Sequence, residues 1–308
     1  MLLLGTTRHL EDLDRQYSLA EDVVVTAIAA GAPAAPAAPA APAAPAAYVL
    51  LDVERIAGID EFELVPIAEL PKPGPPAQSL AVSDGSLLVG FAGAHLAVVD
   101  PRGGTVSAVD AFEHVAGREE WENPAGVTPD LRSIAVTDAG TWLVNVHVGG
   151  VWRSTDRGAQ WENVVAPPAD VHEVVAAPNG RVVAAAAGGF GWSTDDGRSW
   201  DWTAQGLHAS YCRAVALDGD TAYVAASTGP STSDARLYRC RLGGVPEPCG
   251  GGLPASFPFN LDTGSLAARD GHVALGTRDG QVWRSSDGAA TFEAITERVG
   301  HVLVLRFA

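Results

Sequence analysis

The sequence is poor in cysteine and has no long apolar run at its N-terminus. Only 3 of its 308 residues are cysteines, too few for a disulfide framework in a chain of this size. Cys240 and Cys249 could face each other across one hairpin, but we expect free thiols. The opening apolar run, Met1–Leu4, is too short for a signal peptide or a membrane span, and no basic segment precedes it. These absences predict a soluble, cytoplasmic protein.

Basic residues are also scarce. The chain has 20 Lys and Arg against 37 Asp and Glu, a formal net charge of −17. Such a surface repels phosphate backbones and anionic lipids, so we expect neither nucleic acid nor membrane as a partner. Neutral or cationic ligands fit the overall charge better. No phosphate-binding glycine loop, serine nucleophile elbow or four-cysteine zinc pattern is present. We therefore expect no cofactor, and a monomer.

Glycine and proline are abundant, by contrast, with 34 and 21 copies, and hydrophobic residues make up 47% of the chain. This composition favours many short strands joined by tight turns around a large core. Six segments repeat one order of four short strand-like runs, each followed by a turn signal. These segments are 23–70, 78–112, 131–165, 172–204, 212–249 and 264–295. A repeat of four antiparallel strands predicts the blade of a β-propeller.

The two chain ends complete the pattern. The last run, 301–308, has the character of a first strand without successors, and 1–21 reads as second, third and fourth strands without a first. Joined, they form a seventh blade and leave no open sheet edge. We predict a single-domain, all-β, seven-bladed propeller whose N- and C-terminal strands share one blade. The Ala/Pro-rich segment 31–47 interrupts the second blade and is expected to be an extended or disordered loop.

A recurrent turn pattern, Ser-x-Asp-x-Gly-x-x-Trp, closes the last hairpin of several repeats. Two copies fit fully, and a third keeps the Ser, Asp and aromatic residues but has its glycine one position earlier. The residues are Ser154, Asp156, Gly158 and Trp161; Ser193, Asp195, Gly197 and Trp200; and Ser285, Asp287 and Phe292. We expect the Asp carboxylate to accept turn N–H groups and the aromatic ring to pack into the core. A structural staple is favoured over a Ca²⁺ or carbohydrate site.

These turns resemble the Asp boxes of BNR-repeat propellers, which include sialidases, sortilin-type receptors and photosystem assembly factors. The stretches 145–158, 169–174 and 206–216 are similar to uncharacterised bacterial BNR-like proteins that are often labelled exo-α-sialidase. A sialidase implies six blades, three arginines on a carboxylate and an early Arg-Ile-Pro motif. The chain lacks Arg-Ile-Pro and has seven predicted blades. The resemblance therefore implies a fold more strongly than an activity.

In a propeller, the connections between blades and the turns between second and third strands lie on one face, here called the upper face. Loops of several blades converge there, so this is where we expect a ligand site. The candidate binding residues are His147, Asp170, His172, His208, Tyr211, Arg213, Arg132, Asn260 and Asp262.

Three interpretations of these residues compete. His147, His172 and His208 with Asp170 could hold a divalent metal, although no close His spacing supports this. A His base oriented by Asp170, with Arg213 or Arg132 on an anionic group, could form a hydrolase site, including a sialidase-like one. The third and favoured interpretation is hydrogen bonding that locks the blades together. We expect a binding scaffold whose upper face takes a small molecule, a glycan or a protein.

Overall fold

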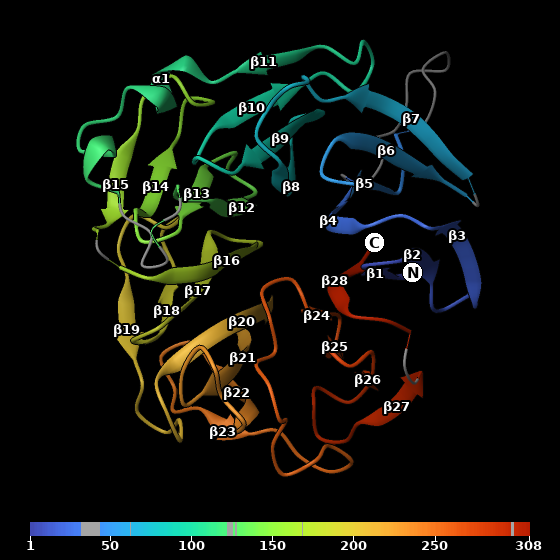
Figure 1. Ribbon diagram of the computed structural model, residues 1–308. Coiled ribbons are helices and arrows are strands. Elements are labelled where there is room, and N and C mark those ends of the chain that lie inside the picture. Colours follow the sequence, from blue (N-terminus) through green and yellow to red (C-terminus); the bar gives the residue numbers. More distant parts are fainter. Residues whose placement is uncertain (32–43, 62, 122–125, 127, 168, 297–298) are drawn as a thin grey trace.

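The computed structural model describes residues 1–31, 44–61, 63–121, 126, 128–167, 169–296 and 299–308. These residues form seven sheets of four antiparallel strands, arranged as blades around a central axis (Figure 1). Within each blade the strands, here called a to d, run from the axis outward. The predicted fold class and the count of seven blades are confirmed.

The strands of the first four blades are as follows. Blade 1 holds β28 (Val302–Phe307), β1 (Leu2–Thr6), β2 (His9–Asp12) and β3 (Tyr17–Glu21). Blade 2 holds β4 (Val25–Ala30), β5 (Ala47–Leu51), β6 (Arg55–Asp60) and β7 (Glu63–Glu69). Blade 3 holds β8 (Ala77–Ser83), β9 (Ser86–Phe91), β10 (Leu96–Val99) and β11 (Val106–Ala108). Blade 4 holds β12 (Leu131–Val136), β13 (Trp142–Val146), β14 (Gly150–Ser154) and β15 (Glu162–Val165).

The remaining three blades complete the ring. Blade 5 holds β16 (Val171–Ala177), β17 (Arg181–Ala186), β18 (Gly189–Ser193) and β19 (Asp201–Thr203). Blade 6 holds β20 (Tyr211–Asp218), β21 (Thr221–Ser227), β22 (Ala235–Arg241) and β23 (Glu247–Pro248). Blade 7 holds β24 (Leu266–Arg269), β25 (His272–Gly276), β26 (Val282–Ser285) and β27 (Glu293–Thr296).

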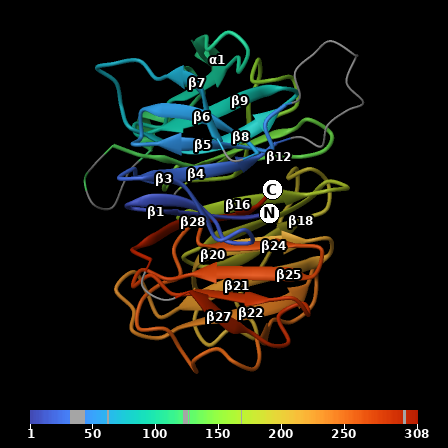
Figure 2. The same cartoon turned by 90° about the vertical axis from the view of Figure 1, so that its right-hand side faces the viewer.

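The chain termini close the ring as the sequence predicts. Strand β28 pairs antiparallel with β1 from Leu2↔Phe307 to Thr6↔Val302, and the two ends lie side by side (Figures 1 and 2). The a strands contact one another in order around the axis, from β28 through β4 to β24 and back to β28. Every blade of the ring therefore has its full set of four strands.

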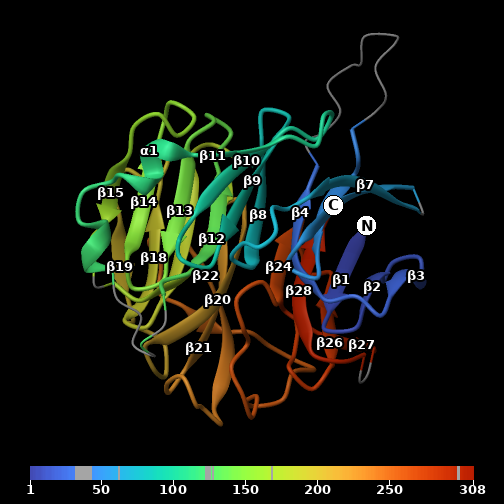
Figure 3. The same ribbon diagram turned by 45° about the horizontal axis from the view of Figure 1, so that its top comes forward.

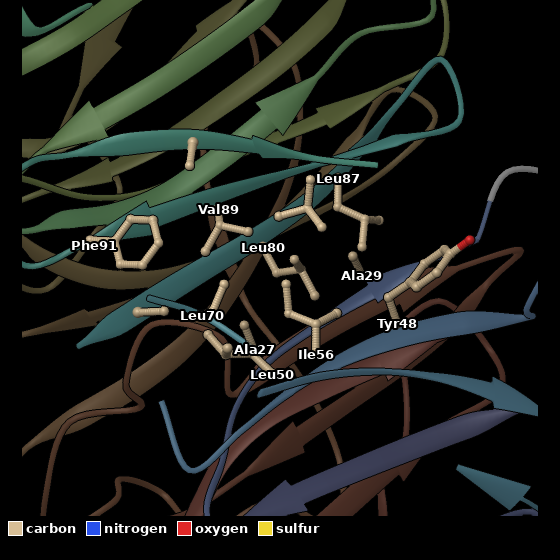
Figure 4. Close-up of a cluster of buried hydrophobic side chains, with 13 residues drawn as sticks. Ala27, Ala29, Tyr48, Leu50, Ile56, Leu70, Leu80, Leu87, Val89 and Phe91 are labelled. Atoms are coloured by element: carbon tan, nitrogen blue, oxygen red, sulfur yellow. The ribbon is translucent and has the colours of Figure 1, made fainter. Parts of the chain in front are cut away.

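Apolar residues explain why the a and b strands occupy the centre. Every residue of β1 and of β13 is buried, because both faces of a blade pack against neighbouring blades. The core between blades 2 and 3 is typical, with Leu50 and Ile56 facing Leu80 and Val89 (Figure 4). Outer strands carry polar residues, and β7 exposes much of its length.

The c–d turns of blades 4, 5 and 7 share one set of hydrogen bonds. In blade 5, buried Ser193 donates its hydroxyl to Asp195 Oδ1 (2.8 Å) and accepts the Gly197 N–H (3.0 Å). Asp195 Oδ1 in turn accepts the Ser199 N–H (2.9 Å). Trp200 packs against the core between blades 4 and 5 and donates its indole N–H to the Gly197 carbonyl. Each turn is thus tied by one buried Ser and one Asp.

Blade 7 shows how the glycine of this turn can move. Gly158 has positive φ, and a Cβ there would lie 2.7 Å from the Trp142 ring. The equivalent position of blade 7 holds Ala289, also with positive φ and fully buried. Val273 of β25 pairs with Ser285 as Trp142 pairs with Ser154, so a valine replaces the tryptophan beside this turn.

Several details differ from the sequence prediction or lie outside it. The expected fourth strand of blade 3 ends at Ala108, and Asp110–Glu113 instead forms the short helix α1 at the rim of the ring (Figure 3). Residues 32–43, most of the Ala/Pro-rich segment, lie outside the described residues. Cys240 and Cys249 are free and belong to the cores on opposite faces of blade 6. No helix in the described ranges is long and apolar enough to span a membrane.

Candidate functional site

The a strands share a distortion at the upper mouth of the central channel. In six blades the a strand has one extra residue relative to its b strand, a β-bulge near its beginning. The extra residues, which we call the bulge ring, are Thr26, Gln78, Arg132, His172, Arg213 and Leu303. Bulges bend a strand and re-aim one side chain, and they are common beside functional sites. The repeated bulge thus places one side chain of each of these six blades near the channel mouth.

Below the bulge ring lies the upper channel cavity, with a volume of about 570 Å³. All members of the ring except His172 line it, together with residues further down the a strands of blades 1 to 5. This volume lies within the usual range of small-molecule pockets, roughly 300–1,000 Å³. The propeller therefore holds a pocket where the sequence predicted that loops converge.

Two arginines of the bulge ring, Arg132 and Arg213, stand close together at this mouth. Enclosure by the protein, reinforced by the positive charge of Arg213, lowers the pKa of Arg132. Asp170 and Asp130 act on Arg132 from a distance, but no carboxylate within the described ranges forms an ion pair with it. Arg213 contacts Asp262 Oδ1 through Nη1 at 3.1 Å. Arg132 is therefore an enclosed cation whose charge no described neighbour neutralises by direct contact.

Asp262 also lies close to two basic side chains, one from blade 7 and one from the connection between blades 7 and 1. Its Oδ2 accepts a hydrogen bond from Arg278 Nη2 at 3.0 Å, and His301 Nε2 lies 3.9 Å away. Both Arg278 and His301 line the same cavity. Burial lowers the pKa of His301 despite the nearby Asp262 carboxylate. The cavity lining holds four arginines against three carboxylates, so it is less acidic than the chain as a whole.

Beside the arginines, Asp170 links blades 4 and 5, and His172 links blade 5 to blade 6. Its Oδ1 lies 3.2 Å from Nε2 of both His147 and His172. Burial alone would raise the pKa of Asp170, but hydrogen bonds and charge from the two histidines hold it well below its usual range. His172 is only 1% exposed, its Nδ1 contacts the Cys212 carbonyl at 2.6 Å, and its ring packs against Tyr211. These contacts tie blade 4 to blade 5 and blade 5 to blade 6.

The remaining predicted site residues lie apart from this group. His208 stacks on Tyr238, with Nδ1 2.9 Å from the tyrosine hydroxyl and Nε2 3.1 Å from the Asp234 carbonyl. Asn260 is buried, accepts a hydrogen bond from Ser227 and donates to the carbonyls of Gly229 and Pro230. Their partners are those of residues that fix loops at the blade 6 edge.

A metal centre made by the three histidines is not assembled. Across the part of the chain that the structure describes, no three His, Cys, Asp or Glu side chains are arranged to hold a metal ion. His147 and His172 meet at Asp170, but His208 is bound to Tyr238 instead. Both ring nitrogens of His172 already have protein partners.

Sequence reasoning missed the residues that cross the channel. Glu173 is buried on β16 and accepts the Val215 N–H (2.9 Å) and the Gly264 N–H (3.0 Å). Next to Gly264, Thr263 donates its hydroxyl to the carbonyls of His172 and Arg213 at 3.2 Å each. The segment before β24 therefore reaches over β20 to β16. Only the placement of a carboxylate directly after a predicted site residue, His172, could have drawn attention to Glu173.

No family model and no curated protein matches the chain. Solved structures with the same fold include the WD40 repeats of RRP9, at 12% identity and a TM-score of 0.62, covering 100% of this chain and 89% of that one. The computationally designed protein Ika8 matches at 13% identity and a TM-score of 0.57, covering 93% and 79%. A GH74 enzyme of Niastella koreensis matches at 16% identity and a TM-score of 0.50, covering 82% and 36%. At these identities the likeness shows the propeller fold alone.

Proposed function

We propose that the protein is a non-catalytic binding module whose upper channel mouth holds an oxyanion, such as a carboxylate, of its ligand. The observation that carries this proposal is Arg132, enclosed beside Arg213 with no direct counter-ion among the described residues. Like charges brought together by a fold cost free energy unless a ligand offsets them. Guanidinium groups bind carboxylate, phosphate and sulfate oxygens in a bidentate manner.

The local charge and the overall charge lead to different expectations. A net charge of −17 favours cationic or neutral ligands, but the arginines at the mouth favour an anionic group. Short-range hydrogen bonds decide the orientation of a bound group, whereas long-range repulsion mainly slows its approach. A small molecule fits the 570 Å³ cavity, and a protein partner would have to present an acidic side chain to the same arginines.

The c–d turns support a finer assignment of the propeller. We infer from their shared Ser–Asp hydrogen bonds that the chain is a BNR/Asp-box repeat propeller. These turns lie between β14 and β15, β18 and β19, and β26 and β27, opposite the b–c turns of the upper face. Their role in this proposal is to hold the hairpins, and the ligand contacts come from the a strands.

The test is calorimetric titration with citrate, phosphate and sulfate at low ionic strength. We expect Arg132→Met to weaken binding of the best anion by about tenfold or more, the loss of one charge-assisted contact of about 1.4 kcal/mol. Arg198→Met, an exposed change in the blade 5 c–d turn, is the matched control and should bind like the wild type. Equal affinities of wild type and Arg132→Met, or no binding of any anion, would refute the proposal.

A hydrolase is the second candidate, and the observation that favours it is the Asp170 carboxylate between two imidazoles beside Tyr211 and the arginines. In such a site the base would be His147, whose side chain is the more exposed of the two imidazoles on Asp170, at 11% against 1% for His172. A panel of chromogenic glycosides and esters tests this activity. Turnover by the wild type that is lost in His147→Ala would establish a hydrolase. No turnover of any substrate in the panel would favour the binding module.

A further inference from the structure

The central channel has a second cavity at its lower end, separate from the mouth described above. It has a volume of about 740 Å³ and lies among the a–b turns of blades 5, 6 and 7. Apolar residues of the a strands form part of its wall, among them Val175, Val215, Leu266 and Phe307, and polar and charged residues form the rest. Charged residues stand at its rim and are largely paired, as in Arg181 with Asp220 and Arg269 with Asp270.

One cation, Arg306 of β28, points into the channel between the two cavities, since it lines both of them. Its side chain is exposed to the channel, yet the surrounding protein lowers the pKa of its guanidinium. Glu173 is the opposing charge that acts on it, but the two form no ion pair or hydrogen bond within the described ranges. Both carboxylate oxygens of Glu173 are instead taken by backbone N–H groups.

A partly apolar cavity with a guanidinium at its inner end favours a ligand that has one carboxylate and one apolar chain. A carboxylate would form charge-assisted hydrogen bonds with Arg306, and an alkyl chain would cover the apolar wall. Burial of each methylene contributes about 0.8 kcal/mol, so a chain of several carbons adds substantially to affinity. A second cation, in contrast, would be repelled, and a neutral alkane would leave the guanidinium without its partner.

We propose that the lower cavity binds a small amphiphilic monocarboxylate, with its carboxylate on Arg306 and its alkyl chain along the wall formed by β16, β20 and β24. This site differs from the bulge-ring site, because Arg132 and Arg213 line only the upper cavity, whereas Arg306 lines both. The lower site would therefore remain even if the upper mouth bound no anion.

The test uses octanoate as the probe, titrated calorimetrically into the full chain, with 1-octanol and butyrate as the uncharged and the short-chain comparison. We expect saturable 1:1 binding of octanoate, and weaker binding of both comparison compounds. Arg306→Met should lower the affinity for octanoate at least about tenfold and leave the affinity for 1-octanol unchanged within about twofold. Arg198→Met, an exposed change in the blade 5 c–d turn, is the matched control and should bind octanoate like the wild type.

Folding of each variant is checked by its thermal melting curve before titration. If Arg306→Met does not fold, Arg306→Gln and Arg306→Lys replace it, and the lysine variant should retain more affinity than the glutamine variant. Octanoate binding that is unchanged in the Arg306 variants would overturn the proposal, as would the absence of binding to the wild type. Binding lost in Arg132→Met but not in Arg306→Met would place the carboxylate at the upper mouth and also overturn it.

Discussion

At the scale of single residues, each of the c–d turns of blades 4, 5 and 7 contains a buried hydroxyl group beneath the exposed carboxylate that makes the motif recognisable. Ser154, Ser193 and Ser285 are each 2% exposed, and each accepts a backbone N–H four residues on while donating to the Asp. The Asp side chain lies outside this buried layer. The Asp makes the motif recognisable in the sequence, whereas the buried Ser both donates to the Asp and accepts a backbone N–H of the turn.

Replacing this buried serine should destabilise the protein. Ser193→Ala removes the acceptor of the buried Gly197 N–H, and we expect the free energy of unfolding to fall by about 1–3 kcal/mol. Ser199→Ala is the matched control, because its exposed hydroxyl donates only to Asp195 Oδ2, and it should cost less than about 0.5 kcal/mol. Urea unfolding measures both. A Ser193→Ala variant as stable as Ser199→Ala would contradict the assignment.

At the scale of elements, the sequence predicted the strands well and the irregularities poorly. Alternation of apolar runs with Gly-containing turns located nearly every strand, including the degenerate pair β22 and β23. The bulges were not predicted, because the a strands are apolar on both faces and show no alternation that an extra residue would interrupt. Helix α1 was missed because its four residues, Asp110–Glu113, show no helical period.

The candidate site was predictable to a similar degree. Arg132, Arg213 and Asp262 were identified because polar residues at the beginnings of a strands must lie at the mouth. His208 and Asn260 also lie in connections that lead to a strands. Their side chains, however, form hydrogen bonds with Tyr238 and Ser227 of blade 6 and do not join this group. That Glu173 and Arg306 act on each other electrostatically could not be predicted from the sequence, because their positions around the channel depend on the curvature of the whole ring.

Glu173 makes a pH-dependent link between inner strands. Burial raises its pKa to about 7 from an ordinary 4.5, although two backbone N–H groups and Arg306 act in the opposite direction. Between these pH values the folded protein holds a proton that the unfolded chain releases, so stability falls as pH rises. The shift corresponds to a loss on the order of 3 kcal/mol between about pH 4.5 and 7.

Glu173→Gln removes the titrating group and so isolates this effect. The difference in the free energy of unfolding between wild type and variant should change across the pH 4.5–7 window and be constant above it. The expected direction is that the wild type loses stability relative to the variant as pH rises. Urea unfolding at several pH values measures the difference, and a difference that is independent of pH would contradict the raised pKa.

At the scale of the whole molecule, the propeller depends on its last strand. Strand β28 pairs with β1 along its length, and its residues pack against blades 2 and 7. Without β28, the ring would lose one of its seven a strands and expose Leu2 and Leu4 of β1, which are fully buried. An exposed apolar sheet edge favours aggregation.

Truncation tests this closure. A chain that ends at residue 301 should be insoluble or lack a cooperative thermal transition. The matched control removes only Ala308, which lies after β28 and donates one backbone N–H to Met1, and should melt close to the full chain. Cooperative unfolding of the longer truncation near the wild-type midpoint would show that the ring closes without β28.

The central claim is that the arginines of the bulge ring form an oxyanion site at the upper channel mouth. Its most direct test is a crystal of the protein soaked in selenate, with the selenium located by anomalous scattering. A peak within hydrogen-bond distance of Arg132 and Arg213, absent from crystals of Arg132→Met, is the predicted result. Selenium peaks elsewhere on the surface with none at the mouth would contradict the claim.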